Sequence, residues 1–280
     1  MVGGGGAVAH EAYLGRSETR QDTVWPTLAA ALAATLDLPD PGEVLPPLWH
    51  WMLFQDWAPA HGLGPDGHPR RGGFMPPLHE LPRRMWAGGR VSFPGTLRIG
   101  EPVSRTRTIT AISDKTGASG RLVFVSLRHE LANAAGVAIV EEQDIVYRGL
   151  EGAAVRPAQA APDAAGALVR SLRPDAVLLF RYSALTGNAH RIHYDLDYAT
   201  QAEGYPGLVV HGPLQATLLA LHAQAAAPGA RLATIRYRGR RPAFHDRDLS
   251  LLAWRDGATV RLETRDDTGA VCMDAEALLA

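Results

Sequence analysis

The sequence predicts an α+β protein in which an antiparallel sheet wraps around a central helix, with two tandem copies of this unit. Three observations support the prediction. A helix-forming segment followed by about four strand-like segments occurs twice along the chain. The later strands alternate apolar and polar residues, which is typical of strands buried on one face. The helix at 213–226 is apolar nearly all round, and such a helix is usually enclosed.

The first half, residues 1–150, begins with a helix-forming segment at 27–38, where Pro26 suits the first helical turn. An apolar segment at 46–57 follows, and then an irregular stretch rich in Gly and Pro at 58–82. Four strands are predicted next, and the last two flank ANAAG as an antiparallel hairpin. These strands are expected at 90–94, 102–113, 121–131 and 137–148.

Residues 151–170 are rich in Ala, Pro and Gly without apolar periodicity, and we interpret them as an interdomain linker. The second half, 171–280, is expected to begin with a strand at VLLFRY, 177–182. A polar loop and a short surface helix at 195–204 lead to the central helix. Four antiparallel strands end the chain, at 231–240, 248–254, 258–266 and 270–279.

Composition excludes several classes of function. The net charge of −1 favours neither nucleic acid nor an anionic membrane as a partner. The single cysteine, Cys272, excludes an intrachain disulfide framework and a cysteine-rich metal site. No apolar run is long enough for a transmembrane helix, and the opening MVGGGGAVAH has no signal-peptide pattern. We therefore expect a protein of the reducing cytoplasm.

The residues that can carry chemistry gather between the first strand of the second half and its helix. The segment 182–195 reads YSALTGNAHRIHYD, and EGYPGLVVHGPL follows at 203–214. Pro213 is well placed as a first helical residue. Gly212 has no side chain, so its N–H can approach a ligand closely at the start of the helix, where a developing oxyanion is stabilised. These segments are predicted to form an active site.

These two segments resemble the signature of the MaoC-like (R)-specific enoyl-CoA hydratases and 3-hydroxyacyl-thioester dehydratases. The matching features are the five-residue spacing from Asn188 to His193 and the VVHG sequence at 209–212. LGPDGHPRRGGFMPP at 63–77 and RRMWAGGR at 83–90 are similar to a narrower branch with mesaconyl-CoA and itaconyl-CoA hydratases and mitochondrial-type dehydratases. The resemblance implies a double hotdog fold.

The resemblance also implies a reaction, the reversible addition of water to an α,β-unsaturated acyl thioester. The substrate is expected to be a short, branched or dicarboxylic acyl group on CoA or an acyl carrier protein, such as mesaconyl- or itaconyl-CoA. His193 is the implied base, and the Gly212 N–H polarises the carbonyl. Asn188 stands where the broader family has Asp, and an amide orients water but accepts no proton. No metal or cofactor is implied besides the CoA of the substrate, and the expected assembly is a homodimer.

Four further residues are candidates for substrate contact, and each also has a structural interpretation. His190 could structure the loop, and Arg191 could be exposed instead of binding a carboxylate or phosphate. Tyr182 could belong to the core, and His211 could be a pocket wall. Asp195 is expected to cap the short helix that follows. The Arg-rich segments HPRRGGF and RRMWAGGR are interpreted as loops that could bind an anion.

Other functions remain open from the sequence. The alternatives are a dehydratase of fatty-acid or polyketide synthesis, an acyl-CoA thioesterase with Glu203 as its carboxylate, and a non-catalytic acyl-thioester binding module. Metal binding by His190 and His193 lacks a third ligand, and no G-x-S-x-G elbow supports a serine hydrolase. The first half shows no matching Asn/His pair, so we interpret it as a degenerate copy with room for a bulky acyl group.

Overall fold

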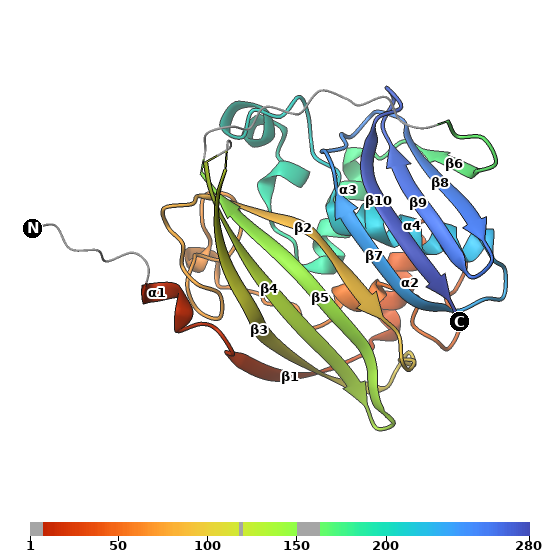
Figure 1. Cartoon of the computed structure of the whole chain (residues 1–280), viewed down its shortest axis with the longest axis horizontal. Coiled ribbons are helices and arrows are strands. Elements are labelled where there is room, and N and C mark those ends of the chain that lie inside the picture. Colours follow the sequence, from red (N-terminus) through yellow and green to blue (C-terminus); the bar gives the residue numbers. More distant parts are fainter. Residues whose placement is uncertain (1–7, 118–119, 150–162) are drawn as a thin grey trace, which may run out of the picture.

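One antiparallel sheet organises the chain. The structure is a computed structural model that describes residues 8–117, 120–149 and 163–280. In these residues ten strands pair in the order β1-β3-β4-β5-β2-β7-β10-β9-β8-β6 (Figure 1). The strands are β1 (Ser17–Thr23), β2 (Arg83–Ser92), β3 (Pro102–Gly117), β4 (Gly120–Asn133), β5 (Gly136–Arg148), β6 (Leu168–Leu172), β7 (Leu232–Gly239), β8 (Leu249–Asp256), β9 (Thr259–Arg265) and β10 (Val271–Leu279).

The strand order is the same in the two halves when each is read from its edge to the centre. The first half runs β1-β3-β4-β5-β2, and the second runs β6-β8-β9-β10-β7. The halves join where β2 pairs antiparallel with β7, for example at Val91 and Ile235. The two predicted copies therefore share one continuous sheet.

Strand β2 corrects the prediction that RRMWAGGR is a loop. The segment lies between β5 and β7 and pairs with both. A Cβ at Gly88 would lie 2.5 Å from the carbonyl oxygen of Tyr237, so glycine permits the close approach of β7. Because the strand is flanked on both sides and contains two glycines, it lacks the alternation by which the other strands were recognised. The strand expected at 90–94 is only its end.

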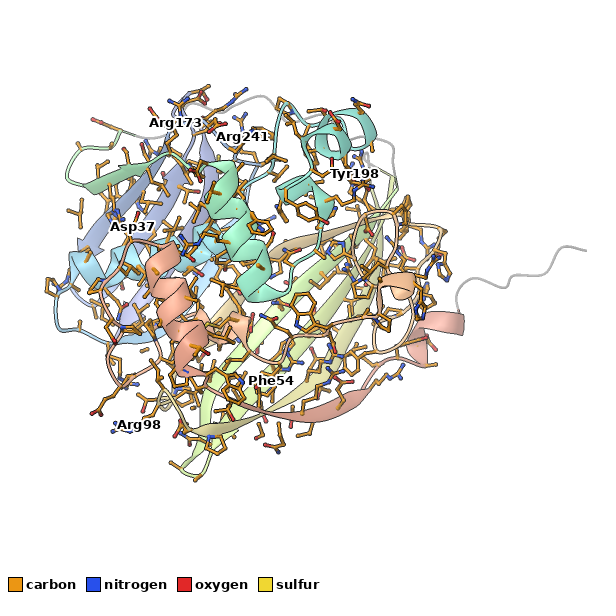
Figure 2. All side chains as sticks on the ribbon, turned by 180° about the vertical axis from the view of Figure 1, so that it is seen from behind. Asp37, Phe54, Arg98, Arg173, Tyr198 and Arg241 are labelled. Atoms are coloured by element: carbon orange, nitrogen blue, oxygen red, sulfur yellow. The ribbon has the colours of Figure 1, made fainter. Side chains whose placement is uncertain are left out.

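The helices are α1 (Val8–Glu11), α2 (Pro26–Thr35), α3 (Ala176–Thr186) and α4 (Gly212–Ala226), with short helical turns at Trp49–Met52, Ala60–Gly62, Arg191–His193 and Tyr198–Ala202. Helices α2, α3 and α4 lie on one face of the sheet (Figure 2). Helix α4 packs on β7 to β10 and is the enclosed helix that the sequence predicts. Figure 2 shows α2 and α3 side by side in front of the sheet. No helix among the described residues has the length and apolar character needed to cross a membrane.

Helix α3 replaces the strand predicted at 177–182, and that prediction is wrong. The Asp175 side chain accepts a hydrogen bond from the backbone N–H of Leu178 (2.7 Å) and caps the first turn. Gly187 ends the helix in the left-handed conformation, with φ of 60°. Tyr182 and Ser183 are buried on one helical face. The apolar run VLLF suggested a strand, but the two caps and packing against α2 favour a helix.

Both halves carry an edge strand before the helix that the sequence did not reveal. Strand β1 pairs with β3, and β6 pairs with β8. Strand β1 is SETRQDT, a polar sequence that edge strands tolerate because one side faces solvent. The predicted linker 151–170 falls mostly outside the described residues, and its last three residues lie in β6. The domain boundaries at 1–150 and 171–280 stay predictions.

Candidate active site

His193 is held in one protonation state by its surroundings. It ends the turn Arg191–His193 and is only 6% exposed. Its Nδ1 lies 2.7 Å from the carbonyl oxygen of Val209, an acceptor, so Nδ1 carries the hydrogen and Nε2 keeps its lone pair. Burial lowers the pKa of His193 to about 4. The side chain is therefore a neutral imidazole, oriented to accept a proton at Nε2.

His211 forms the wall behind His193. The two rings stack with centroids 3.7 Å apart. Its Nε2 is hydrogen-bonded to the Ser183 hydroxyl at 2.8 Å, and burial lowers its pKa well below the usual value. Tyr182 lies on its other side, 5.1 Å between ring centroids, with its hydroxyl 3.4 Å from that of Thr217. His211 and Tyr182 are therefore buried neighbours of the base, and their predicted contact with substrate stays a prediction.

Gly212 begins α4 beside this stack. Its N–H belongs to the first turn of the helix and has no acceptor within the helix. A Cβ there would lie 2.7 Å from Cε3 of Trp86, so only glycine fits without moving the indole. Trp86 in turn stacks on Tyr237, with ring centroids 4.7 Å apart. The helix start therefore offers a backbone donor against a fixed aromatic wall.

Asn188 lies in the turn that follows α3. Its N–H bonds to the carbonyl oxygen of Ser183 (2.9 Å), which completes the helix end. Its side-chain oxygen accepts the backbone N–H of His190 at 3.1 Å. The amide oxygen is thus engaged locally, and the amide hydrogens are what Asn188 can offer to a ligand.

Asp66 and His68 reach the same site from the first half of the chain. The carboxylate of Asp66 lies 3.1 Å from Nδ1 of His68, and the His68 ring is 4.5 Å from the ring of His190. The His190 ring stands nearly perpendicular to that of His193, 5.7 Å away. Asp66, His68 and His190 each offer one ligand atom, and these atoms lie within 4.8 Å of one another. This group of possible metal ligands includes His190 but not His193, so it differs from the His190–His193 pair considered from the sequence.

The pKa values of Asp66, His68 and His190 are all lower than those of the same groups in solution. Burial acts to raise the pKa of Asp66, but the hydrogen bonds from the His68 side chain and backbone, together with the interactions of the carboxylate with the His68 and His190 rings, outweigh it and lower that pKa to about 2. Burial also lowers the pKa of His68, and it lowers the pKa of His190 to about 3. At neutral pH the cluster therefore holds one ionised carboxylate among neutral imidazoles.

The loop that carries Asp66 packs against the segment 188–195, which is the candidate catalytic loop. The Arg191 N–H bonds to the carbonyl oxygen of Asp66 (2.9 Å). Gly67 has φ of 89°, and a Cβ there would overlap the carbonyl oxygen of Ala189. Tyr194 donates its hydroxyl hydrogen to the same oxygen at 3.0 Å. These contacts fix the position of Asp66 relative to His193.

Arg191 forms contacts that stabilise the loops around it. Its guanidinium forms an ion pair with Asp195 at 2.7 Å and donates to the carbonyl oxygen of Pro65 at 3.0 Å. It therefore links the first-half loop to the turn Arg191–His193, and its predicted contact with a substrate carboxylate or phosphate stays untested. Asp195 also accepts the N–H of Tyr198 (3.0 Å), so the predicted cap is confirmed. Figure 2 labels Tyr198, in the short helix that follows.

The structure thus brings together most of the residues predicted from the sequence, and it adds Asp66, His68 and Trp86. Sequence reasoning treated 58–82 as an irregular stretch and RRMWAGGR as a loop. The available signal was PDGHP, where two residues capable of proton transfer flank a glycine. Nothing in the sequence alone connects that loop to His193, 125 positions further along the chain from His68.

Comparison with known proteins identifies relatives over most of the chain. The model of the family described as hydroxyacyl-thioester dehydratase type 2 matches residues 48–245, more than half of the chain. A mesaconyl-C(4)-CoA hydratase from Chloroflexus aurantiacus is 44% identical over 270 residues, which cover 94% of this chain and 95% of that protein. These matches include both the first-half loop and the catalytic loop.

Solved structures of similar fold cover the whole architecture. A MaoC-like dehydratase from Phytophthora capsici superposes with a TM-score of 0.73 at 18% identity, covering 98% of each chain. A Mycobacterium tuberculosis protein described as a double hotdog has a TM-score of 0.57 at 13% identity, covering 95% of this chain and 96% of that one. At these identities the likeness shows the fold alone, and the predicted double hotdog fold is confirmed.

Proposed function

Since this chain belongs to the hydroxyacyl-thioester dehydratase type 2 family and is a hydro-lyase of enoyl thioesters, we propose that its substrate is a short dicarboxylic enoyl-CoA, such as mesaconyl-CoA. The relative at 44% identity is a mesaconyl-C(4)-CoA hydratase, and the match extends over nearly the full length of both chains. The predicted membership of the MaoC-like dehydratases and the predicted enzyme class are confirmed by these matches.

The proposed reaction adds water across the double bond next to the thioester. His193 Nε2 takes a proton from water while the water oxygen bonds to C3. The π electrons move toward the thioester, and the resulting enolate oxygen accepts the Gly212 N–H; one such donor is worth about 10²–10³ in rate. His193 then returns its proton to C2, so all atoms of the water are added. The amide hydrogens of Asn188 help to hold the water.

The observation that carries this assignment is the protonation state of His193. A buried imidazole with Nδ1 tied to a carbonyl and Nε2 unprotonated is suited to accept a proton, and it lies beside a helix start that suits an oxyanion. The test is a panel of enoyl-CoA thioesters assayed by the loss of conjugated-thioester absorbance, with wild type and His193→Ala. Full activity of the variant would remove His193 from its role, and release of free CoA would indicate a thioesterase.

Asp66 is the proposed source of the carboxylate that position 188 lacks. It is ionised, and it accepts the Nδ1 hydrogen of His68, which leaves His68 Nε2 as an acceptor for a hydrogen of water. Asp66 would act through His68, so its role is to position and polarise that imidazole. His190 lies between this pair and His193. The site would then combine residues from both halves of the chain.

The variant Asp66→Asn tests this role, with Asp197→Asn as a control that removes an exposed charge from the neighbouring segment. We expect a fall in kcat of about 10²-fold at nearly constant KM for Asp66→Asn, partial recovery with Asp66→Glu, and no change for the control. Activity should also be insensitive to EDTA. Activity that is lost to EDTA and restored by Zn²⁺ would instead make Asp66, His68 and His190 metal ligands.

Three finer points are proposed on the resemblance and composition alone. Itaconyl-CoA is an alternative dicarboxylic substrate, a homodimer is the expected assembly, and the cytoplasm is the expected location. The substrate panel addresses the first, and sedimentation of the purified protein addresses the second.

A further inference from the structure

A small cavity lies in the first half beside the Asp66–His68 loop. Its volume is about 160 Å³, well below the 300–1,000 Å³ of pockets for drug-sized ligands. The walls combine cationic and apolar side chains on the loop and on the sheet, namely Asp56, Pro69, Arg70, Arg71, Gly72, Phe74, Met75, Pro76, Arg84, Arg107 and Tyr147. A larger cavity borders Leu221 and Gln224, roughly 15 Å along α4 from Gly212, too far for a short acyl group.

The cavity has more cations than anions. Arg107 is paired with Glu18 at 2.7 Å and with Asp56 at 3.5 Å. Arg71 donates to the carbonyl oxygens of Leu78 and Leu81, both at 2.6 Å, so it is held by dipoles. In the part of the chain that the structure describes, no carboxylate forms an ion pair with Arg71 or with the partly buried Arg84. A partly buried cation of this kind favours an anionic ligand.

Arg84 is placed between the cavity and the catalytic cluster. It lies opposite Tyr147 across the β2–β5 pairing, and both residues line the cavity. Its charge is close enough to lower the pKa of both His68 and His190. Trp86 is two residues further along β2, so the two side chains share a face of the sheet. Trp86 is also the residue that contacts Gly212.

We propose that Arg84, together with the Tyr147 hydroxyl, binds the free carboxylate of a dicarboxylic acyl group whose thioester carbonyl lies at Gly212. This inference rests on the proposed hydratase function and adds the residue that selects the substrate. Residues two apart in a strand are separated by about 6.6 Å. The three carbon–carbon bonds of a four-carbon acyl chain, about 1.5 Å each, put its carboxyl carbons at most about 4.5 Å apart, and the oxygens at the two ends extend this span to about 7 Å at most.

A phosphate of CoA is the other anion that could occupy the cavity, and the geometry favours the acyl carboxylate. The pantetheine arm separates the phosphates from the thioester, whereas Arg84 is one strand repeat from the residue that contacts Gly212. The apolar walls formed by Phe74 and Met75 suit the methyl and methylene groups of a short branched acyl chain. A guanidinium beside a phenol can hold a carboxylate by two or three charge-assisted hydrogen bonds.

The test compares mesaconyl-C4-CoA with crotonyl-CoA, which carries the same CoA but no acyl carboxylate. For Arg84→Gln we expect kcat/KM to fall about 10- to 100-fold on the dicarboxylic substrate and to change less than about threefold on the neutral one. Tyr147→Phe should show the same selectivity with a smaller loss. Arg90→Gln is the matched control, because Arg90 is an exposed cation on the same strand, paired with Glu142.

The outcomes separate failure of this inference from failure of the proposed function. If Arg84→Gln lowers kcat/KM equally on both substrates, Arg84 belongs to CoA binding or to folding. If kcat/KM falls on neither substrate, Arg84 is not part of the site. Either result overturns this inference but leaves the hydratase function in place. A wild-type enzyme that hydrates only crotonyl-CoA overturns the inference together with the proposed dicarboxylic substrate, while the hydratase reaction stands. A wild type that hydrates neither thioester would overturn the proposed function itself. Retained activity on crotonyl-CoA also shows that the variant is folded.

Discussion

The pH dependence of activity is a direct consequence of the burial of His193. The proposed base works in its neutral form, and burial lowers its pKa to about 4. The acid limb of kcat/KM reports the pKa of this group in the free enzyme. Activity should therefore stay nearly constant from pH 8 down to about pH 5, whereas a solvated histidine would already lose its function near pH 6.5.

The size of the effect follows from the two pKa values. At pH 5.5 a histidine with a pKa of 4 is about 97% neutral, and one with a pKa of 6.5 is about 9% neutral. The buried site should thus retain about ten times more activity at pH 5.5 than a solvated base would allow. The same shift implies that folding stability falls as the pH drops below about 6.5, because the unfolded chain then binds protons that the buried histidine does not.

The assay should isolate His193 from other groups that titrate. A pantetheine thioester of a neutral enoyl acid is suitable, because the phosphate of CoA titrates near pH 6 and an acyl carboxylate would add its own limb. The measurement is kcat/KM between pH 4.5 and 8, with circular dichroism at each pH to show that the protein is folded. If kcat/KM of the folded protein instead falls on the acid side with a midpoint near pH 6.5, the reasoning is refuted. His193 would then be solvated or would not be the base.

Three substitutions test other parts of the site. Gly212→Ala should lower kcat at least tenfold and reduce thermal stability, because the new Cβ would lie 2.7 Å from Trp86; unchanged kcat would contradict the proposed donor. Gly67→Ala should destabilise the fold by about 1–3 kcal/mol in denaturant unfolding, since φ is positive and the Cβ would overlap the oxygen of Ala189; wild-type stability would mean that the loop moves freely. Asn188→Asp should keep or increase activity in the same assay, because a carboxylate accepts the same backbone N–H and can hold the water by accepting one of its hydrogens; a collapse would mean that the amide hydrogens are required.

Short-range patterns determined a large part of the molecule. The hairpin of β4 and β5, the alternation in β9 and β10 and the apolar surface of α4 were readable because each depends on neighbouring residues along the chain. The spacing of Asn188, His193 and Gly212 was readable for the same reason, as all lie within 25 residues. Local patterns gave the wrong secondary structure for α3, because its apolar run suits either a helix or a strand. They also missed most of β2, because its glycines interrupt the pattern expected of a strand that pairs on both sides.

The sequence by itself thus determined the fold class and indicated His193 and Gly212 as the proposed base and backbone donor, while only the tertiary structure decided what surrounds them. Asp66 and His68 meet His190 because the first-half loop docks on the catalytic turn, and no pattern within the chain reveals that contact. Arg84 borders the same cluster because β2 joins the two halves of the sheet. The lowered pKa of His193 could not be predicted from the sequence either. Burial makes it costly to charge the imidazole, and His193 is buried only after both halves have packed.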